Sequence, residues 1–149
     1  MAALYTAIAT ATGEGRAGGR AVSEDGTLDV TLAVPAALGG PGGGTNPEQL
    51  FAAGWASCFH SALKSVAAAE KTPISDSAVV AEIGLVADGS GGFTLEAALH
   101  VEISGLPQDA AERLVARAHE VCPYSNATRG NIAVRITTTT DDDAATAVA

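Results

Sequence analysis

Apolar side chains recur along this chain with two different periods, which separate predicted strands from predicted helices. Residues 27–34 alternate between apolar and more polar side chains, which is the period of a half-buried strand. The turn pair Asp25-Gly26 joins this segment to residues 20–23 as a hairpin. By the same criteria the predicted strands are residues 4–12, 20–23, 27–34, 77–87, 92–103 and 131–138.

Residues 47–70 repeat their apolar positions at the spacing of a helix. Asn46 suits the N-cap of this helix, Pro47 its first position and Gln49 its third, which is a variant of the capping box. The apolar surface is wide, and Glu48 is the only charge in the first half of the helix. We therefore expect a long central helix that is mostly buried, either in the fold or in a dimer.

The predicted elements follow the order β-β-β-α-β-β-α-β, in which the second helix covers about residues 108–121. Antiparallel hairpins with helices grouped separately indicate an α+β fold rather than a doubly wound parallel sheet. We find no internal repeat and predict a single domain over residues 1–138. Residues 139–149 hold a run of aspartates followed by small residues, so we expect an acidic, disordered tail.

Composition and charge narrow the class of partner. The chain has 149 residues, of which 47% are hydrophobic and only 17% charged, which is enough to bury a core. Its 8 Lys plus Arg against 17 Asp plus Glu give a net charge of −9, which argues against nucleic acid and against an anionic membrane surface. No window approaches the ~20 apolar residues of a membrane span, and no secretory signal is evident, so we expect a cytoplasmic protein.

Cys58 and Cys122 are the first candidates for chemistry. Structural disulfides are rare in the cytoplasm, so each thiol is either reactive or a small buried core residue. Each lies on the apolar stripe of its helix, so packing of the two helices could bring the sulfurs together. Sequence alone does not show that the Cα atoms come within the ~7 Å that a disulfide requires. With three dispersed histidines, two cysteines cannot make a Cys-rich zinc site, and we predict no bound metal.

A reactive thiolate needs a nearby cation or hydrogen-bond donor, and Arg16 is the candidate cation. It lies in a glycine-rich loop that permits close backbone approach, although an exposed turn arginine is the simpler interpretation. Glu48 could complement the dipole of the first helical turn or hold an arginine in a bidentate pair. Glu48 and Cys58 are ten residues apart, roughly 15 Å along a continuous helix. If both serve one site, Glu48 comes from a second copy of the chain, which predicts a two-fold dimer.

The histidines leave a second reaction class open. His119 precedes Cys122 by three residues and could pair in space with Cys58 as base and nucleophile of a hydrolase or acyl-transferase. The sequence offers no third group to orient the histidine. A non-enzymatic redox stress protein, which would form its disulfide slowly and without preference among oxidants, is a further alternative.

Two segments resemble the organic hydroperoxide resistance (Ohr) branch of the Ohr/OsmC family. NPEQLFAAGWASCF, from Asn46 to Phe59, resembles the helix that carries the peroxidatic cysteine, and VCPYSNATRGN, which begins at Val121, resembles the second-cysteine segment. The Gly15-Arg16 loop lies where the family keeps its active-site arginine. The resemblance spans about residues 4–138 and implies the OsmC-like fold, with an intertwined two-fold dimer.

The resemblance also implies a thiol peroxidase that binds no metal or cofactor. Cys58 is then the peroxidatic thiolate, whose sulfenic acid condenses with Cys122 to form a disulfide. Arg16 stabilises the thiolate, and Glu48 orients Arg16. The implied external reductant is a dihydrolipoamide-type dithiol on a lipoylated protein.

The residues around Cys58 on its helix favour organic peroxides over hydrogen peroxide. An apolar pocket rewards an alkyl or aryl tail on the substrate. We therefore predict a substrate pocket formed by Phe51, Trp55 and Phe59. The substrates that the resemblance implies are fatty-acid and aryl-alkyl hydroperoxides.

Overall fold

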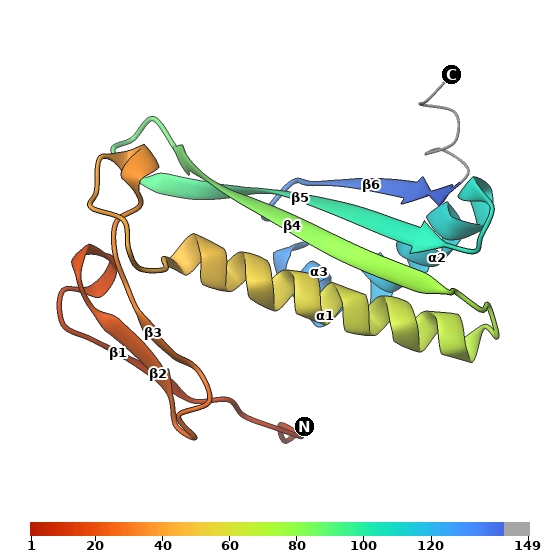
Figure 1. The fold of residues 1–149 in the computed structure, drawn as a ribbon, viewed down its shortest axis with the longest axis horizontal. Helices are drawn as coiled ribbons and strands as arrows, with labels where there is room; N and C mark the ends of the chain where they lie inside the picture. The colour runs from red at the N-terminus through yellow and green to blue at the C-terminus, as the bar shows by residue number, and fades with distance from the viewer. Residues whose placement is uncertain (142–149) are drawn as a thin grey trace. The chain divides into compact units, whose positions relative to one another are not determined.

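The computed structural model of this protein describes residues 1–141, which divide into two units (Figure 1). The first unit is Met1–Leu50, and the second begins at Phe51. Among the residues described, no helix is both long and apolar enough to cross a membrane. The elements have the following bounds: β1 Ala9–Thr12, β2 Arg20–Ser23, β3 Asp29–Thr31, α1 Pro47–Ala69, β4 Asp76–Ala87, β5 Phe93–Ser104, α2 Gln108–Val121, α3 Pro123–Thr128 and β6 Val134–Thr140.

The first unit contains a small antiparallel sheet in the order β1-β2-β3. The hairpin predicted around Asp25-Gly26 is confirmed, because β2 pairs with β3 across this turn. β1 is shorter than the strand predicted over residues 4–12. Its ladder with β2 runs from Ala9 to Thr12, and one further hydrogen bond, from the Glu24 N–H to the Ile8 carbonyl, continues it.

The second unit contains the sheet β4-β5-β6. β4 and β5 form the long antiparallel hairpin that the sequence predicts. β6 lies parallel to β5, which requires the crossover connection that α2 and α3 supply. The predicted α+β class is confirmed.

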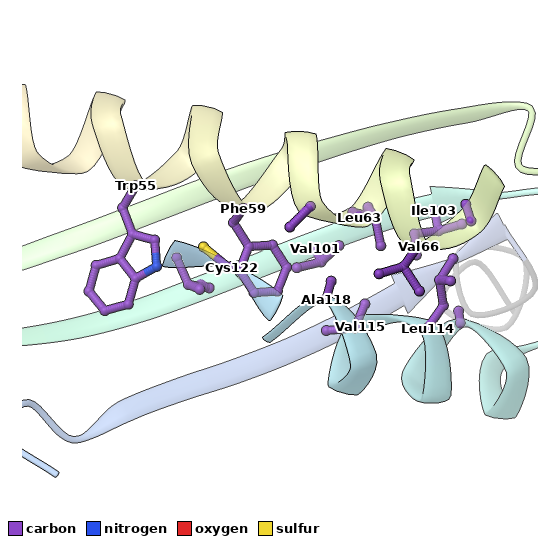
Figure 2. Packing of buried hydrophobic residues seen from close by; sticks show 14 of the residues in the cluster. Trp55, Phe59, Leu63, Val66, Val101, Ile103, Leu114, Val115, Ala118 and Cys122 are labelled. Carbon is purple, nitrogen blue, oxygen red and sulfur yellow. The ribbon is translucent and has the colours of Figure 1, made fainter. Parts of the chain in front are cut away.

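The core lies where α1 and α2 meet the sheet (Figure 2). Trp55, Phe59 and Leu63 of α1 are completely buried there, as are Leu99 of β5 and Ala118 of α2. Figure 2 shows the α1 side chains pointing toward α2. The burial predicted for the central helix therefore holds for one face of α1.

The opposite face of α1 is exposed in the single chain. It carries small residues, among them Ala53, Ser57 and Ser61. The hydroxyl groups of the two serines bond back to carbonyls one turn earlier in the helix. No described residue of this chain covers this second face of α1, so only something outside the described residues, such as another molecule, could bury it.

Two features of the C-terminal part differ from the prediction. Pro123 ends α2 as expected, but it also occupies the first turn of a short additional helix, α3, because proline suits a first helical position. β6 ends at Thr140 rather than at residue 138, and Thr139 pairs with Glu102. The tail predicted from Thr139 therefore starts too early, and residues 142–149 lie outside the described part of the chain.

Candidate active site

The start of α1 is fixed by a side-chain cap. The Oδ1 atom of Asn46 accepts a hydrogen bond of 2.9 Å from the Gln49 main-chain N–H, so the predicted N-cap is confirmed. The reciprocal half of the capping box is not formed, because the Gln49 side chain accepts a hydrogen bond from Thr45 instead. This cap places Glu48 in the first turn of the helix.

Glu48 and Arg16 form a bidentate ion pair inside the first unit. The Arg16 Nη1 and Nη2 atoms donate to the two carboxylate oxygens at 2.9 and 2.7 Å. Arg16 lies in a short 3-10 turn, Gly15–Ala17, and Gly15 has a positive φ of 57° that favours glycine. The Arg16 hydrogen bonds lower the pKa of Glu48, and Glu48 in turn raises the pKa of Arg16.

This pair fixes the direction of the guanidinium group. The Arg16 side chain remains 36% exposed, against 15% for Glu48, so the arginine is held in place without being enclosed. The carboxylate uses only part of the guanidinium's donor set, and further N–H groups stay available for an anion. The bidentate arrangement that the sequence allowed for Glu48 is therefore formed.

In the second unit, the two cysteines lie together as free thiols. The Sγ atoms of Cys58 and Cys122 are 3.7 Å apart, with Cys122 placed to donate to Cys58. Cys122 is completely buried at the end of α2, whereas Cys58 is partly exposed on α1. Packing of α1 against α2 has brought together two residues that are 64 positions apart in the chain.

The surroundings of Cys58 oppose its ionisation. Burial raises the pKa of the Cys58 thiol, and the nearby Cys122 raises it further. The main-chain N–H of Tyr124 acts in the other direction, because its hydrogen bond to the sulfur lowers the pKa. A reactive thiolate at neutral pH therefore calls for additional positive charge near Cys58.

Aromatic residues of α1 connect the cysteines to α3. Trp55 Nε1 donates to the Ser125 hydroxyl at 3.4 Å, and the Phe51 ring lies 5.7 Å from Trp55 and 6.0 Å from Tyr124. Trp55 and Phe59 have no exposed surface, so their burial assigns them to the core that supports Cys58. Phe51 is partly exposed, and the substrate pocket predicted from Phe51, Trp55 and Phe59 stays a prediction.

Tyr124 and Ser125 lie in the predicted second-cysteine segment, but no role in the site was predicted for either. The available signal was Pro123, which can start a helix as well as end one. A helix that begins there directs the next residues back toward α1.

The sequence matches the OsmC-like protein family over residues 40–137, a range that contains both cysteines and Glu48. The chain belongs to this family. An organic hydroperoxide resistance protein of Xanthomonas axonopodis pv. citri is 51% identical over 135 residues, which cover 90% of this chain and 94% of that protein. The organic hydroperoxide resistance protein OhrB of Bacillus subtilis is 47% identical, with coverage of 90% and 97%.

The OsmC-like fold that the sequence predicts is confirmed by solved structures. A crystal structure of an organic hydroperoxide resistance protein from Legionella pneumophila superimposes with a TM-score of 0.88. It is 51% identical in sequence, and the match covers 93% of this chain and 99% of that one. The predicted resemblance to the Ohr branch of the OsmC family is therefore confirmed.

The alternative Cys–His pair is not supported by the contacts of this OsmC-family chain. The His119 ring packs against Phe59, with ring centroids 6.4 Å apart. In the part of the chain that the structure describes, the buried Nδ1 atom of His119 has no hydrogen-bond partner, and Cys58 is paired with Cys122 instead. Burial lowers the pKa of His119, and the charge of Arg129 lowers it further.

Proposed function

We propose that this protein is a cysteine-based peroxidase that reduces organic hydroperoxides to alcohols. The observation that carries the proposal is the 3.7 Å separation of the Cys58 and Cys122 sulfurs. It occurs in an OsmC-family chain whose relatives at about half identity are named organic hydroperoxide resistance proteins.

The reaction needs only the two thiols and an external dithiol. The Cys58 thiolate attacks the outer oxygen of the hydroperoxide, the O–O bond breaks, and the leaving alkoxide takes a proton to become an alcohol. Cys58 is thereby oxidised to a sulfenic acid. The Cys122 sulfur then attacks the Cys58 sulfur, which forms the disulfide and releases water.

The disulfide must be reduced for another turnover. A dithiol of the dihydrolipoamide type, carried on a lipoylated protein, reduces the Cys58–Cys122 disulfide by thiol–disulfide exchange. The external dithiol is oxidised to its own disulfide, and both cysteines return to thiols. We expect this exchange in the cytoplasm, where thiols are kept reduced. None of these steps requires a bound metal or cofactor.

Arg16 and Glu48 supply the charge that Cys58 lacks. Since burial raises the pKa of Cys58, a guanidinium beside the sulfur would favour the thiolate and stabilise negative charge on the peroxide oxygens. Glu48 keeps Arg16 aimed through the bidentate pair. The ten-residue offset from Glu48 to Cys58 on the continuous helix α1 supports a dimer in which each chain provides the arginine for its partner's cysteine.

A free-thiol titration tests the peroxidase itself. The reduced protein is treated with one equivalent of cumene hydroperoxide, and in parallel with hydrogen peroxide. We expect rapid loss of both thiols of each chain, faster with the organic peroxide and reversed by dihydrolipoamide. Slow loss, or equal rates with the two oxidants, would contradict the proposal and leave only the fold in common with the named relatives.

Mixing two inactive variants tests the shared site. Arg16→Ala and Cys58→Ser homodimers each lack one component at both sites. If the site is shared, a mixed dimer carries both defects at one site and neither at the other, so random exchange restores about a quarter of wild-type activity. No recovery after verified exchange of subunits would place Arg16 and Cys58 of the same chain in one site.

A further inference from the structure

We propose that Gly54 is a positioning residue of this site: it leaves the space on α1 in which the Tyr124 ring lies, and so holds the Tyr124 main-chain N–H against the Cys58 sulfur. The inference rests on the proposed function only for its consequence in catalysis. The positioning itself is a property of the reduced protein and is testable without a hydroperoxide.

A side chain at position 54 would have to displace the side chain of Tyr124. A Cβ atom at this position would lie 2.9 Å from the Tyr124 hydroxyl oxygen and 3.2 and 3.3 Å from two carbons of its ring. Glycine is the poorest helix former after proline, and Gly54 lies well inside the 23 residues of α1. Its place in the helix is therefore explained by the approach of Tyr124.

Tyr124 is fixed from two further sides. The Phe51 ring lies 6.0 Å from the Tyr124 ring, and the neighbouring Ser125 accepts a hydrogen bond from the buried Trp55. Phe51, Gly54 and Trp55 are successive positions on one side of α1, just before Cys58. This side of α1 therefore sets the position of the Tyr124 backbone as well as that of its ring.

The main-chain N–H of Tyr124 is a hydrogen-bond donor that has no partner within its helix. Pro123 has no N–H, and the N–H groups of a first helical turn have no partner within the helix. The Tyr124 N–H is therefore available to the Cys58 sulfur, and its interaction with that sulfur lowers the pKa of Cys58. A hydrogen bond to an ionised sulfur is stronger than one to a thiol, so this contact favours the thiolate form.

The ring of Tyr124 packs over Gly54 on α1. It is 38% exposed, whereas the aromatic residues on the inner side, Trp55 and Phe59, are completely buried. Gly54 therefore leaves room for an aromatic ring that stays partly open to solvent beside α1.

The test compares Gly54→Ala with a matched control, Ser65→Ala. Both changes improve helix propensity in α1, but Ser65 is exposed and has no described side-chain hydrogen bond. The pKa of Cys58 is read from the pH dependence of its alkylation, located by mass spectrometry. We expect Gly54→Ala to raise this pKa by about one, equivalent to a thiolate fraction roughly ten times lower at neutral pH, and Ser65→Ala to leave it unchanged.

The emission of Trp55, the only tryptophan, reports the position of α3 in the same samples. A wild-type alkylation profile together with wild-type emission in Gly54→Ala would overturn the inference, while peroxidase activity of the wild-type protein would stand unaffected. Should Gly54→Ala fail to fold, Tyr124→Ala leaves α1 unchanged. It must raise the pKa of Cys58 in the same direction, because the N–H loses the ring that anchors it; an unchanged pKa there overturns the inference equally.

Discussion

Oxidation of the two cysteines should stabilise the fold, and the structure sets the size of the effect. The Sγ atoms of Cys58 and Cys122 already lie 3.7 Å apart, so a disulfide can form by a small closing movement between α1 and the end of α2. The perturbation is one equivalent of cumene hydroperoxide added to the reduced protein. The quantity of interest is the difference in the free energy of unfolding between the oxidised and reduced forms.

The expected gain comes from the unfolded chain. A Cys58–Cys122 disulfide closes a loop that spans 64 positions. Closing such a loop removes conformational entropy from the unfolded state, which is equivalent to about 4 kcal/mol at room temperature. For a domain of this size, the same difference raises Tm by roughly 10 °C.

The difference in the free energy of unfolding is measured by urea unfolding. The fluorescence emission of Trp55 follows the transition, because this buried residue is the only tryptophan. The oxidised and reduced proteins are compared at equal concentration, and Cys122→Ser treated with the same oxidant is the control. We expect the control to show no gain. An oxidised wild-type protein that carries the disulfide yet unfolds at the same urea concentration as the reduced one would refute the reasoning.

Three substitutions test the roles of individual side chains. Cys58→Ser should abolish the reduction of cumene hydroperoxide, measured as alcohol formed with a dithiol present, because no thiolate remains to attack the O–O bond. Cys122→Ser should complete one oxidation and then stop with Cys58 as a sulfenic or higher acid, visible by mass spectrometry; sustained turnover would remove its resolving role. Arg16→Lys should slow the oxidation step at least tenfold, because an ammonium cannot reproduce the bidentate pair with Glu48; a wild-type rate in a stopped-flow measurement would show that the geometry of the pair is unimportant.

The central helix could be predicted from local signals. The Asn46 cap, Pro47 and the apolar stripe are properties of neighbouring residues, and α1 follows them within one residue at its end. β1 could not be delimited in this way. Its length depends on how many residues β2 offers as partners, and that is set by pairing rather than by propensity.

The residues of the candidate site could be predicted from the sequence, but the distances between them could not. Cys58 and Cys122 each lay on an apolar stripe, yet their separation depends on how α1 and α2 pack in three dimensions. Gly54 and Tyr124 lie in the two segments that resemble the family, but no role was predicted for either residue, for the same reason. A glycine in a helix and a tyrosine after a proline acquire meaning only when the two segments are seen in contact.

The proposed mechanism predicts how the reaction rate depends on pH, and Glu48 and Cys58 contribute differently. The hydrogen bonds from Arg16 lower the pKa of Glu48 below its ordinary value of 4.5. A lowered pKa means that the ion pair stabilises the fold above that ordinary value and loses this contribution only as the pH falls through the lowered one. Glu48 therefore stays ionised throughout the neutral range and adds no limb to the rate profile there.

The pKa of Cys58 is shifted in the opposite direction to that of Glu48. Burial raises the pKa of its thiol above the ordinary value of 9.0, so the second unit by itself disfavours the thiolate at neutral pH. If Arg16 offsets the raised pKa of Cys58, the oxidation rate should rise with pH in a single step that reports the ionisation of Cys58. Glu48→Gln should move the midpoint of that step to higher pH, because Arg16 is then held less firmly. The rate with cumene hydroperoxide, measured from mildly acidic to alkaline pH, decides this. A limb that stays in place in Glu48→Gln would mean that the carboxylate does not act on Cys58 through the arginine, and the Arg16–Glu48 pair would then be explained by the stability of the first unit alone.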